Sequence, residues 1–138
     1  MTILDTDVLS ALMRQTPQKK VVDWLDQQPS TSIWTTSITI LEVRFGLQIL
    51  EAGKRRSALM RAFDEVLEAM SHRVAAFDTA AAEMAGDLMA ARQKRGRRGD
   101  LRDTMIAGIV VANHATLATH NTAHFSDLAV PVVDPFAT

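Results

Sequence analysis

Hydrophobic and polar residues follow one another in short blocks along the chain, and the spacing within each block indicates a strand or a helix. Short apolar runs bounded by polar residues predict strands at 2–4, 32–35, 73–77, 115–119 and 130–133. Apolar residues three or four positions apart predict helices at about 6–14, 17–29, 37–53, 54–70, 78–94 and 105–112. Strands separated by one or two helices form a parallel sheet with helices on both faces. The pattern therefore predicts one domain over residues 1–138, an α/β/α sandwich with a short, mainly parallel central sheet.

The third predicted helix carries an apolar stripe with a carboxylate beside it. The stripe consists of Ile38, Leu41, Phe45 and Ile49. Glu42 lies about a turn and a half into the helix, next to the stripe rather than opposite it. Glu42 is therefore neither a helix cap nor a residue of a plainly polar face.

Composition describes a globular protein and excludes several classes of function. The chain has 138 residues, of which 47% are hydrophobic and 22% charged, with a net charge of −1. The longest apolar run, residues 106–112, is far shorter than the ~20 residues of a membrane span. The first ten residues lack the Lys or Arg that begins a signal peptide, so we expect none. The absence of cysteine excludes disulfides, thiolate catalysis and Cys-ligated zinc, and we expect a cytoplasmic protein that does not bind membranes.

Several carboxylates stand at predicted strand ends and helix starts. Asp5 directly follows the first strand, Asp7 lies two residues further on, and Asp103 precedes the most apolar helix. Helix capping explains Asp7 and Asp103 individually, as it does Asp78, but it does not explain Glu42. Ligands of open parallel sheets bind at the carboxyl ends of the strands, so the alternative is that Asp5, Glu42 and Asp103 converge on a divalent cation. An oxygen-only ligand set favours magnesium or manganese over zinc.

Basic and histidine residues add two weaker signals. Five of the seven residues at 92–98 are Lys or Arg, which is typical of a solvated helix end and also of a phosphate-binding segment. Thr6 and Ser37 are further favoured helix-cap residues. His120 and His124 flank Asn121 just after a predicted strand, but their spacing does not define a zinc site.

Three segments resemble the motifs of PIN-domain nucleases, in the same order along the chain. They are ILDTDVLSAL, SITILEVRFGL and GRRGDLRDTMIAGIVVANHATLATHNTAHF, followed by the terminal VPVVDPF. The chain is most similar to the VapC toxins, especially their FitB-like branch. The resemblance implies a PIN-like fold and a magnesium-dependent endoribonuclease, with Mn²⁺ as a substitute metal. In that family the site carboxylates correspond to Asp5, Glu42 and Asp103.

The chain departs from the family pattern at two positions. The fourth acidic residue of the family falls in TLATHNTAHF, where the candidates are Asn121 and His124. Position 7 is usually Asn in the family and is Asp7 here. Asp7 and Asp100 are the carboxylates that could substitute for the missing acid.

The resemblance also implies a mechanism and partners. Metal-activated water would hydrolyse an RNA phosphodiester, Thr6 would hydrogen-bond a site carboxylate, and Arg97 and Arg98 would meet the RNA backbone. A cognate antitoxin protein and a homodimer are expected, with DNA contacted only through the antitoxin. Apolar residues of the second helix, such as Val21 and Trp24, would supply the dimer surface or the core.

Two other functions remain open from the sequence. ILDTDVL also resembles the first motif of Asp-nucleophile phosphatases, with Asp5 as nucleophile and Asp7 as acid/base, although GDLRD is one residue short of the second motif. A PIN-like module weakened by loss of the fourth acid, which chiefly binds its antitoxin, is the non-enzymatic alternative.

Overall fold

A five-stranded, fully parallel sheet forms the centre of the molecule. The computed structural model describes residues 1–137. The strands lie in the order β3-β2-β1-β4-β5, with β1 in the middle. Their bounds are β1 Thr2–Leu4, β2 Ile33–Thr36, β3 Val74–Ala75, β4 Thr116–Ala118 and β5 Val132–Val133.

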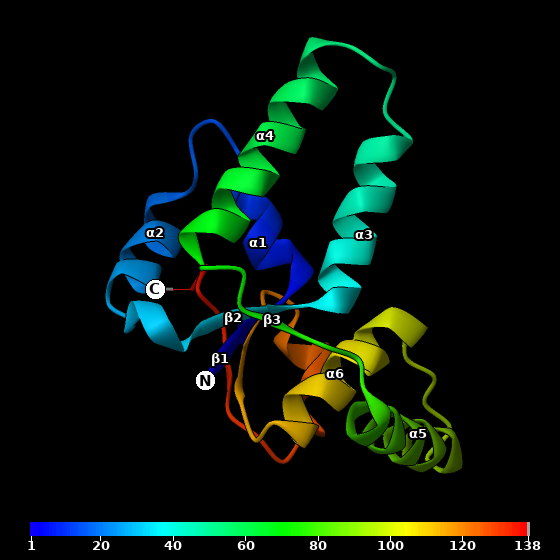
Figure 1. The fold of residues 1–138 in the computed structure, drawn as a ribbon. Coiled ribbons are helices and arrows are strands. Elements are labelled where there is room, and N and C mark those ends of the chain that lie inside the picture. The colour runs from blue at the N-terminus through cyan, green and yellow to red at the C-terminus, as the bar shows by residue number, and fades with distance from the viewer. Residues whose placement is uncertain (138) are drawn as a thin grey trace.

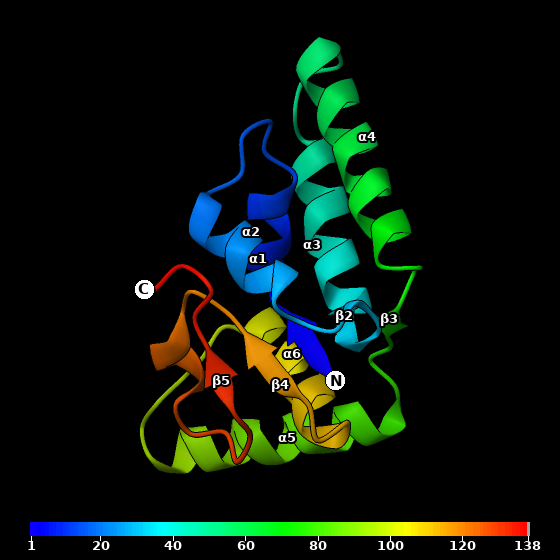
Figure 2. The same cartoon turned by 90° about the vertical axis from the view of Figure 1, so that its left-hand side faces the viewer.

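Six α-helices cover the two faces of this sheet. They are α1 Thr6–Leu12, α2 Lys19–Asp26, α3 Ser37–Gln48, α4 Lys54–Ala69, α5 Thr79–Lys94 and α6 Leu101–Ala112, with 3₁₀ turns η1 Ser30–Ser32 and η2 Thr122–Phe125. Figures 1 and 2 show α1 to α4 on one face and α5 with α6 on the other. The predicted α/β/α sandwich is confirmed. No helix within residues 1–137 is both long and apolar enough to cross a membrane.

Alternating side chains of β1 build a separate core on each face of the sheet. Ile3 packs with Ile106 and Phe125 on the side of α5 and α6, whereas Leu4 packs with Val8 and Phe63 on the side of α1 to α4. Side chains of a strand point alternately to opposite faces, so β1 is buried from both directions. Asp5, the next residue, is thereby placed between two layers of helices.

Helices α5 and α6 pack closely because α6 has a glycine at their contact. A Cβ atom on Gly108 would collide with the Ala81 carbonyl oxygen and would lie 2.8 Å from the Ala85 Cβ. The close contact fixes α6, and with it Asp103, against the sheet.

Several predicted helix boundaries are wrong by one to five residues. The caps of α1, α3 and α6 are Asp5, Thr36 and Asp100 rather than Thr6 or Asp7, Ser37 and Asp103, because extended backbone persists to those residues. The cap of α5 is Asp78, as predicted. Helix α2 begins two residues after Pro17, and Gly53 begins α4 rather than closing α3.

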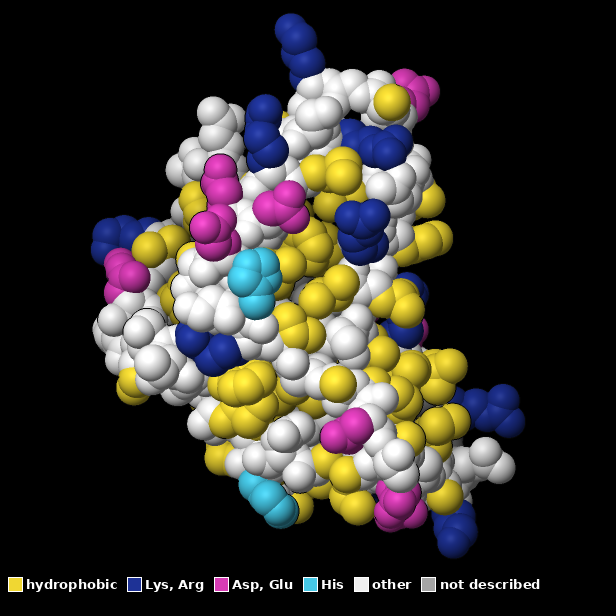
Figure 3. Space-filling view, viewed as in Figure 1, with side chains coloured by type: hydrophobic (Ala, Val, Ile, Leu, Met, Phe, Trp, Pro, Cys, Tyr) yellow, Lys and Arg dark blue, Asp and Glu magenta, His cyan; other side chains and the backbone are white. Residues whose placement is uncertain are grey.

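The apolar stripe predicted for α3 is mostly on the outside of the molecule. Leu41, Phe45 and Ile49 are 52%, 57% and 68% exposed, and only Ile38 of the stripe is buried. The buried side of α3 instead carries Thr39, Val43 and Leu47, which face α1 and α4. In Figure 3, hydrophobic side chains are accordingly visible over α3. Glu42 lies beside this stripe, as predicted, at the edge nearer α1, where the Thr6 hydroxyl binds its carboxylate.

Candidate active site

The carboxyl ends of β1 and β4 bring Asp5 and Thr119 together. Leu4 and Ala118 are paired in register, so the residues that follow them are neighbours. The Thr119 hydroxyl donates a 2.8 Å hydrogen bond to Oδ2 of Asp5, and the Thr6 N–H donates one of 2.8 Å to Oδ1. Asp5 is only 4% exposed. Two fixed donors therefore hold a buried carboxylate in one orientation.

Burial raises the pKa of Asp5 to about 7. The loss of solvation is the largest cause, and the negative charges of Asp7 and, to a smaller extent, Asp103 act in the same direction. The hydrogen bonds from Thr119 and Thr6 oppose this shift. The ionised form of Asp5 is therefore unfavourable unless a cation lies near it. Asp103, which is distant in the sequence, contributes to this effect.

Glu42 is joined to this site through Thr6. The Thr6 hydroxyl donates a 2.8 Å hydrogen bond to Oε1 of Glu42 and lies 3.0 Å from the Thr39 hydroxyl. Thr36, which caps α3, accepts the Thr39 N–H at 3.0 Å and so fixes the start of that helix. The other Glu42 oxygen lies 3.8 Å from Nε of Arg102. The hydrogen bond that the resemblance implies from Thr6 to one of the candidate carboxylates is therefore present.

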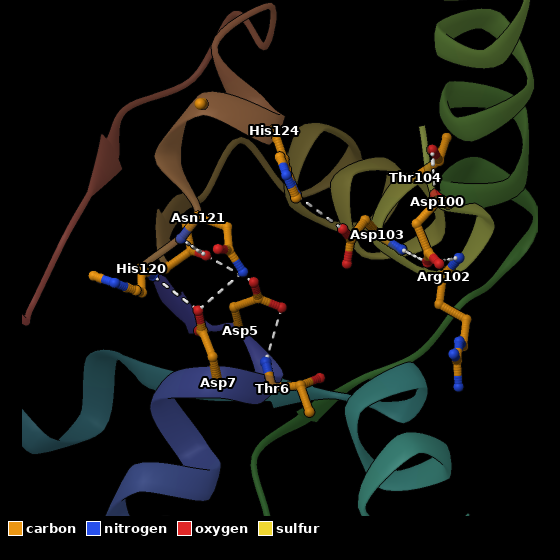
Figure 4. Close-up of polar contacts among 12 residues, drawn as sticks. Asp5, Thr6, Asp7, Asp100, Arg102, Asp103, Thr104, His120, Asn121 and His124 are labelled. Atoms are coloured by element: carbon orange, nitrogen blue, oxygen red, sulfur yellow. Dashed lines mark hydrogen bonds and ion pairs between the residues drawn. The ribbon is translucent and has the colours of Figure 1, made fainter. Parts of the chain in front are cut away.

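Asp103 stands in the first turn of α6, and its carboxylate is not used for capping. The cap is Asp100, whose Oδ1 accepts the N–H groups of Arg102 and Asp103 at 2.9 and 3.1 Å. The Asp103 carboxylate instead lies 3.4 Å from Nδ1 of His124. Capping therefore does not account for Asp103, which is oriented toward the interior of the site (Figure 4).

Asp7 occupies the opposite side of the site, next to Asn121. Oδ2 of Asp7 accepts the His120 N–H at 3.0 Å and lies 3.4 Å from the Asn121 amide nitrogen. Oδ1 of Asp7 is buried, and it has no hydrogen-bond partner within the part of the chain that the structure describes. Burial raises the pKa of Asp7. The two positions at which the chain departs from the family pattern are therefore in contact.

The donor set fits a hard divalent cation in type and charge. Carboxylate oxygens are the ligands that Mg²⁺ and Mn²⁺ prefer, and the unpartnered Asp7 oxygen is an acceptor without a donor. Within residues 1–137, no three His, Asp or Glu side chains are already arranged to hold a metal ion. In this structure Glu42 is paired with Arg102, and Asp103 lies beside His124, so both carboxylates have side-chain partners within the chain.

A second polar network supports the rim of the site and was not predicted from the sequence. Arg92, only 6% exposed, forms a two-pronged ion pair with Asp127 at 2.9 Å for both contacts. It also donates to the Thr104 hydroxyl and to the His124 carbonyl oxygen, each at 3.0 Å. This arginine lies in the basic run at 92–98, where nothing in the sequence distinguishes it from its exposed neighbours.

Fold and site together define an α/β domain with a group of acidic side chains at the carboxyl edge of a parallel sheet. The sequence matches the PIN domain family over residues 2–131. It is 35% identical to the VapC ribonuclease Y4jK of Sinorhizobium fredii, over 99% of this chain and 98% of the relative. It is 28% identical to toxin FitB of Neisseria gonorrhoeae, over 99% of both chains.

Solved structures show the same fold. The crystal structure of FitAcB from Neisseria gonorrhoeae matches with a TM-score of 0.89 and 28% identity over 100% of both chains. DNA-bound VapBC from Salmonella typhimurium matches with a TM-score of 0.79 and 25% identity over 97% of both chains. The chain therefore belongs to the PIN domain family, and its relatives include VapC and FitB proteins.

Proposed function

We propose that this protein is a magnesium-dependent endoribonuclease and the toxin of a toxin–antitoxin pair. The observation that carries the proposal is the arrangement of Asp5 and Asp103, which lie far apart in the sequence and stand around one polar site at the carboxyl end of β1 (Figure 4). The relatives named as a VapC ribonuclease and a FitB toxin support the same activity. The family match offers no support for the Asp-nucleophile phosphatase.

Each side chain has a distinct role in this proposal. Asp5 and Asp103 would hold Mg²⁺, or Mn²⁺ in its place, directly or through water. The ion lowers the pKa of a bound water and stabilises negative charge on a phosphoryl group. Glu42, held by Thr6, orients the attacking water. Thr119 fixes the Asp5 carboxylate, so that it needs no reorientation when the substrate binds.

Asp7 replaces the fourth acid of the family in this proposal. Its buried Oδ1 is free to bind a cation or a metal-bound water, while Oδ2 is held by the His120 N–H. The Asn121 amide lies beside it and supplies a neutral polar neighbour. Asp100 is a weaker candidate because its Oδ1 already caps α6. This replacement argues against the weakened-module alternative, whose main support is the missing acid.

The proposed partners are a cognate antitoxin, RNA and a second copy of the chain. Solved complexes named FitAB and VapBC, some bound to DNA, support an antitoxin partner. We propose that DNA is contacted only through this antitoxin. Val21 of α2 is buried, so the homodimer would use the exposed apolar residues of α3 rather than α2.

The proposal is tested by incubating the purified protein with single-stranded RNA and with DNA of the same sequence. We expect RNA fragments in Mg²⁺, none in EDTA, and none from Asp103→Asn. Asp64→Asn, which alters an exposed carboxylate on α4, is the matched control and should cleave like the wild type. Cleavage that persists in EDTA, or in Asp103→Asn, would contradict the assignment.

A further inference from the structure

A pocket of about 260 Å³ opens beside the candidate active site. It lies between the loop that joins α5 to α6 and the turn η2, and Arg97, Arg98 and His124 contribute to its lining. Asp103 lines the pocket as well, and it is also one of the three candidate carboxylates of the active site (Figure 4). The pocket therefore borders the candidate active site at Asp103.

The inner wall of this pocket is rigid. Arg92 is anchored by four hydrogen bonds that join α5 to Asp127, Thr104 and the His124 backbone. A Cβ atom on Gly99 would lie 2.8 Å from Nη1 of Arg92, so the loop passes tightly over the guanidinium group. A preformed wall of this kind lowers the entropic cost of binding a ligand.

Among the charged side chains that line the pocket, Arg97 and Arg98 are the ones without a hydrogen-bond or ion-pair partner within residues 1–137, whereas Asp103 lies 3.4 Å from Nδ1 of His124. Asp127 is neutralised by Arg92, and Oδ1 of Asp100 is engaged by backbone N–H groups at the start of α6. Arg97 and Arg98 are exposed, and neither forms an ion pair with any residue between 1 and 137. Two arginines are thus free to bind an anion next to an acidic site that by itself repels anions.

We propose that this pocket is a phosphate subsite, which binds a phosphodiester of the same RNA strand next to the one that is cleaved. The proposal rests on the RNA cleavage proposed above and adds how the strand is held. Guanidinium groups match phosphate oxygens in geometry and charge. Because Asp103 borders both surfaces, a phosphate in the pocket places the following or preceding phosphate over the carboxylates. The pocket thereby sets the position of the strand while Asp5 and Asp103 act on it.

The test compares RNA binding by two double variants in an Asp5→Asn background, which is not expected to cleave. Arg97→Gln/Arg98→Gln removes the two pocket charges, and Arg55→Gln/Arg61→Gln removes two exposed charges from α4. Fluorescence anisotropy with a labelled single-stranded RNA gives the affinity over a range of salt concentrations. Each phosphate contact on a single strand contributes about 0.7 to the slope of log affinity against log salt. Because the pocket binds one phosphate, we expect the magnitude of the slope to fall by about 0.7 for the pocket variant and to stay unchanged for the α4 variant.

A second measurement locates the contact along the strand. Single neutral methylphosphonate linkages are placed in turn along the RNA. One linkage should weaken binding to the Asp5→Asn protein, and the same linkage should have no effect once Arg97 and Arg98 are replaced. Equal slopes for the two double variants, or equal sensitivity to every linkage, would overturn the subsite.

The outcome is distinguishable from failure of the proposed function. If the wild type does not cleave RNA, but the pocket variant binds RNA with a smaller salt slope and without sensitivity to any single linkage, the subsite stands and the nuclease assignment falls. If the wild type cleaves and the pocket variant keeps the wild-type KM, salt slope and linkage profile, the nuclease stands and the subsite falls.

Discussion

Replacing Asp5 by Asn should stabilise the protein at neutral pH in the absence of divalent metal. The pKa of Asp5 is about 7 in the folded chain, against an ordinary value of 3.8. The folded chain therefore binds this proton more tightly than the unfolded chain does, and stability is lost as pH rises from about 4 to about 7. At about 1.4 kcal/mol per pH unit, ionising Asp5 costs about 4 kcal/mol in total. Asn is isosteric with Asp and carries no charge, so it avoids that cost.

Urea denaturation in EDTA measures this effect. The stability of Asp5→Asn relative to the wild type should grow by about 3 kcal/mol between pH 5 and pH 8, because about two pH units of that interval lie below the folded pKa. Because the prediction concerns the change in stability between two pH values, any loss of hydrogen-bond energy that is the same at both pH values cancels. The exposed Asp64→Asn should show no such trend. A difference that stays constant or shrinks with pH would refute the electrostatic account of Asp5.

Three further substitutions test the site and the scaffold. The double variant Asp7→Asn/Asn121→Asp should keep the Mn²⁺ affinity of the wild type in calorimetry, whereas Asp7→Asn alone should bind Mn²⁺ at least tenfold more weakly. Equal Mn²⁺ affinity for the wild type and both variants would show that Asp7 does not contribute to metal binding. Arg92→Met removes the buried partner of Asp127 and leaves the exposed Arg95, at 3.3 Å, as its remaining ion-pair partner. The substitution should cost about 3 kcal/mol in urea denaturation, whereas an effect below about 1 kcal/mol would contradict the buried ion pair. Phe45 is exposed on α3, the proposed dimer surface, so Phe45→Glu should convert a dimer of two 15.2 kDa chains into a monomer in light scattering. A wild type that is itself monomeric would contradict the dimer.

The parallel sheet between two layers of helices and the location of Asp5 at the end of the first strand follow directly from the sequence. A short apolar run can end only where a polar residue begins, and Asp5 ends the first run. A parallel arrangement then places that residue at the functional edge of the sheet. Periodicity therefore predicts both the fold class and the first carboxylate.

Details that depend on neighbouring elements are not predictable in this way. Periodicity identifies an apolar stripe on α3, but the side that is buried depends on where α1 and α4 pack, and Phe45 lies outside that contact. Composition shows a basic run, but the burial of Arg92 depends on Asp127, which is 35 residues away. The contact between Asp7 and Asn121 likewise arises only when β1 and β4 become neighbours.

Metal binding measured beside catalysis tests the central claim most directly. Mn²⁺ binding, followed by electron paramagnetic resonance, and the rate of RNA cleavage are compared for the wild type, Asp5→Asn, Glu42→Gln and Asp103→Asn. We predict that the wild type binds Mn²⁺ and cleaves RNA, and that Asp5→Asn and Asp103→Asn lose both properties together. We expect Glu42→Gln to lose cleavage with a smaller loss of Mn²⁺ affinity. A variant of Asp5 or Asp103 that binds Mn²⁺ as tightly as the wild type, or cleaves RNA as fast, would contradict the assignment of these carboxylates.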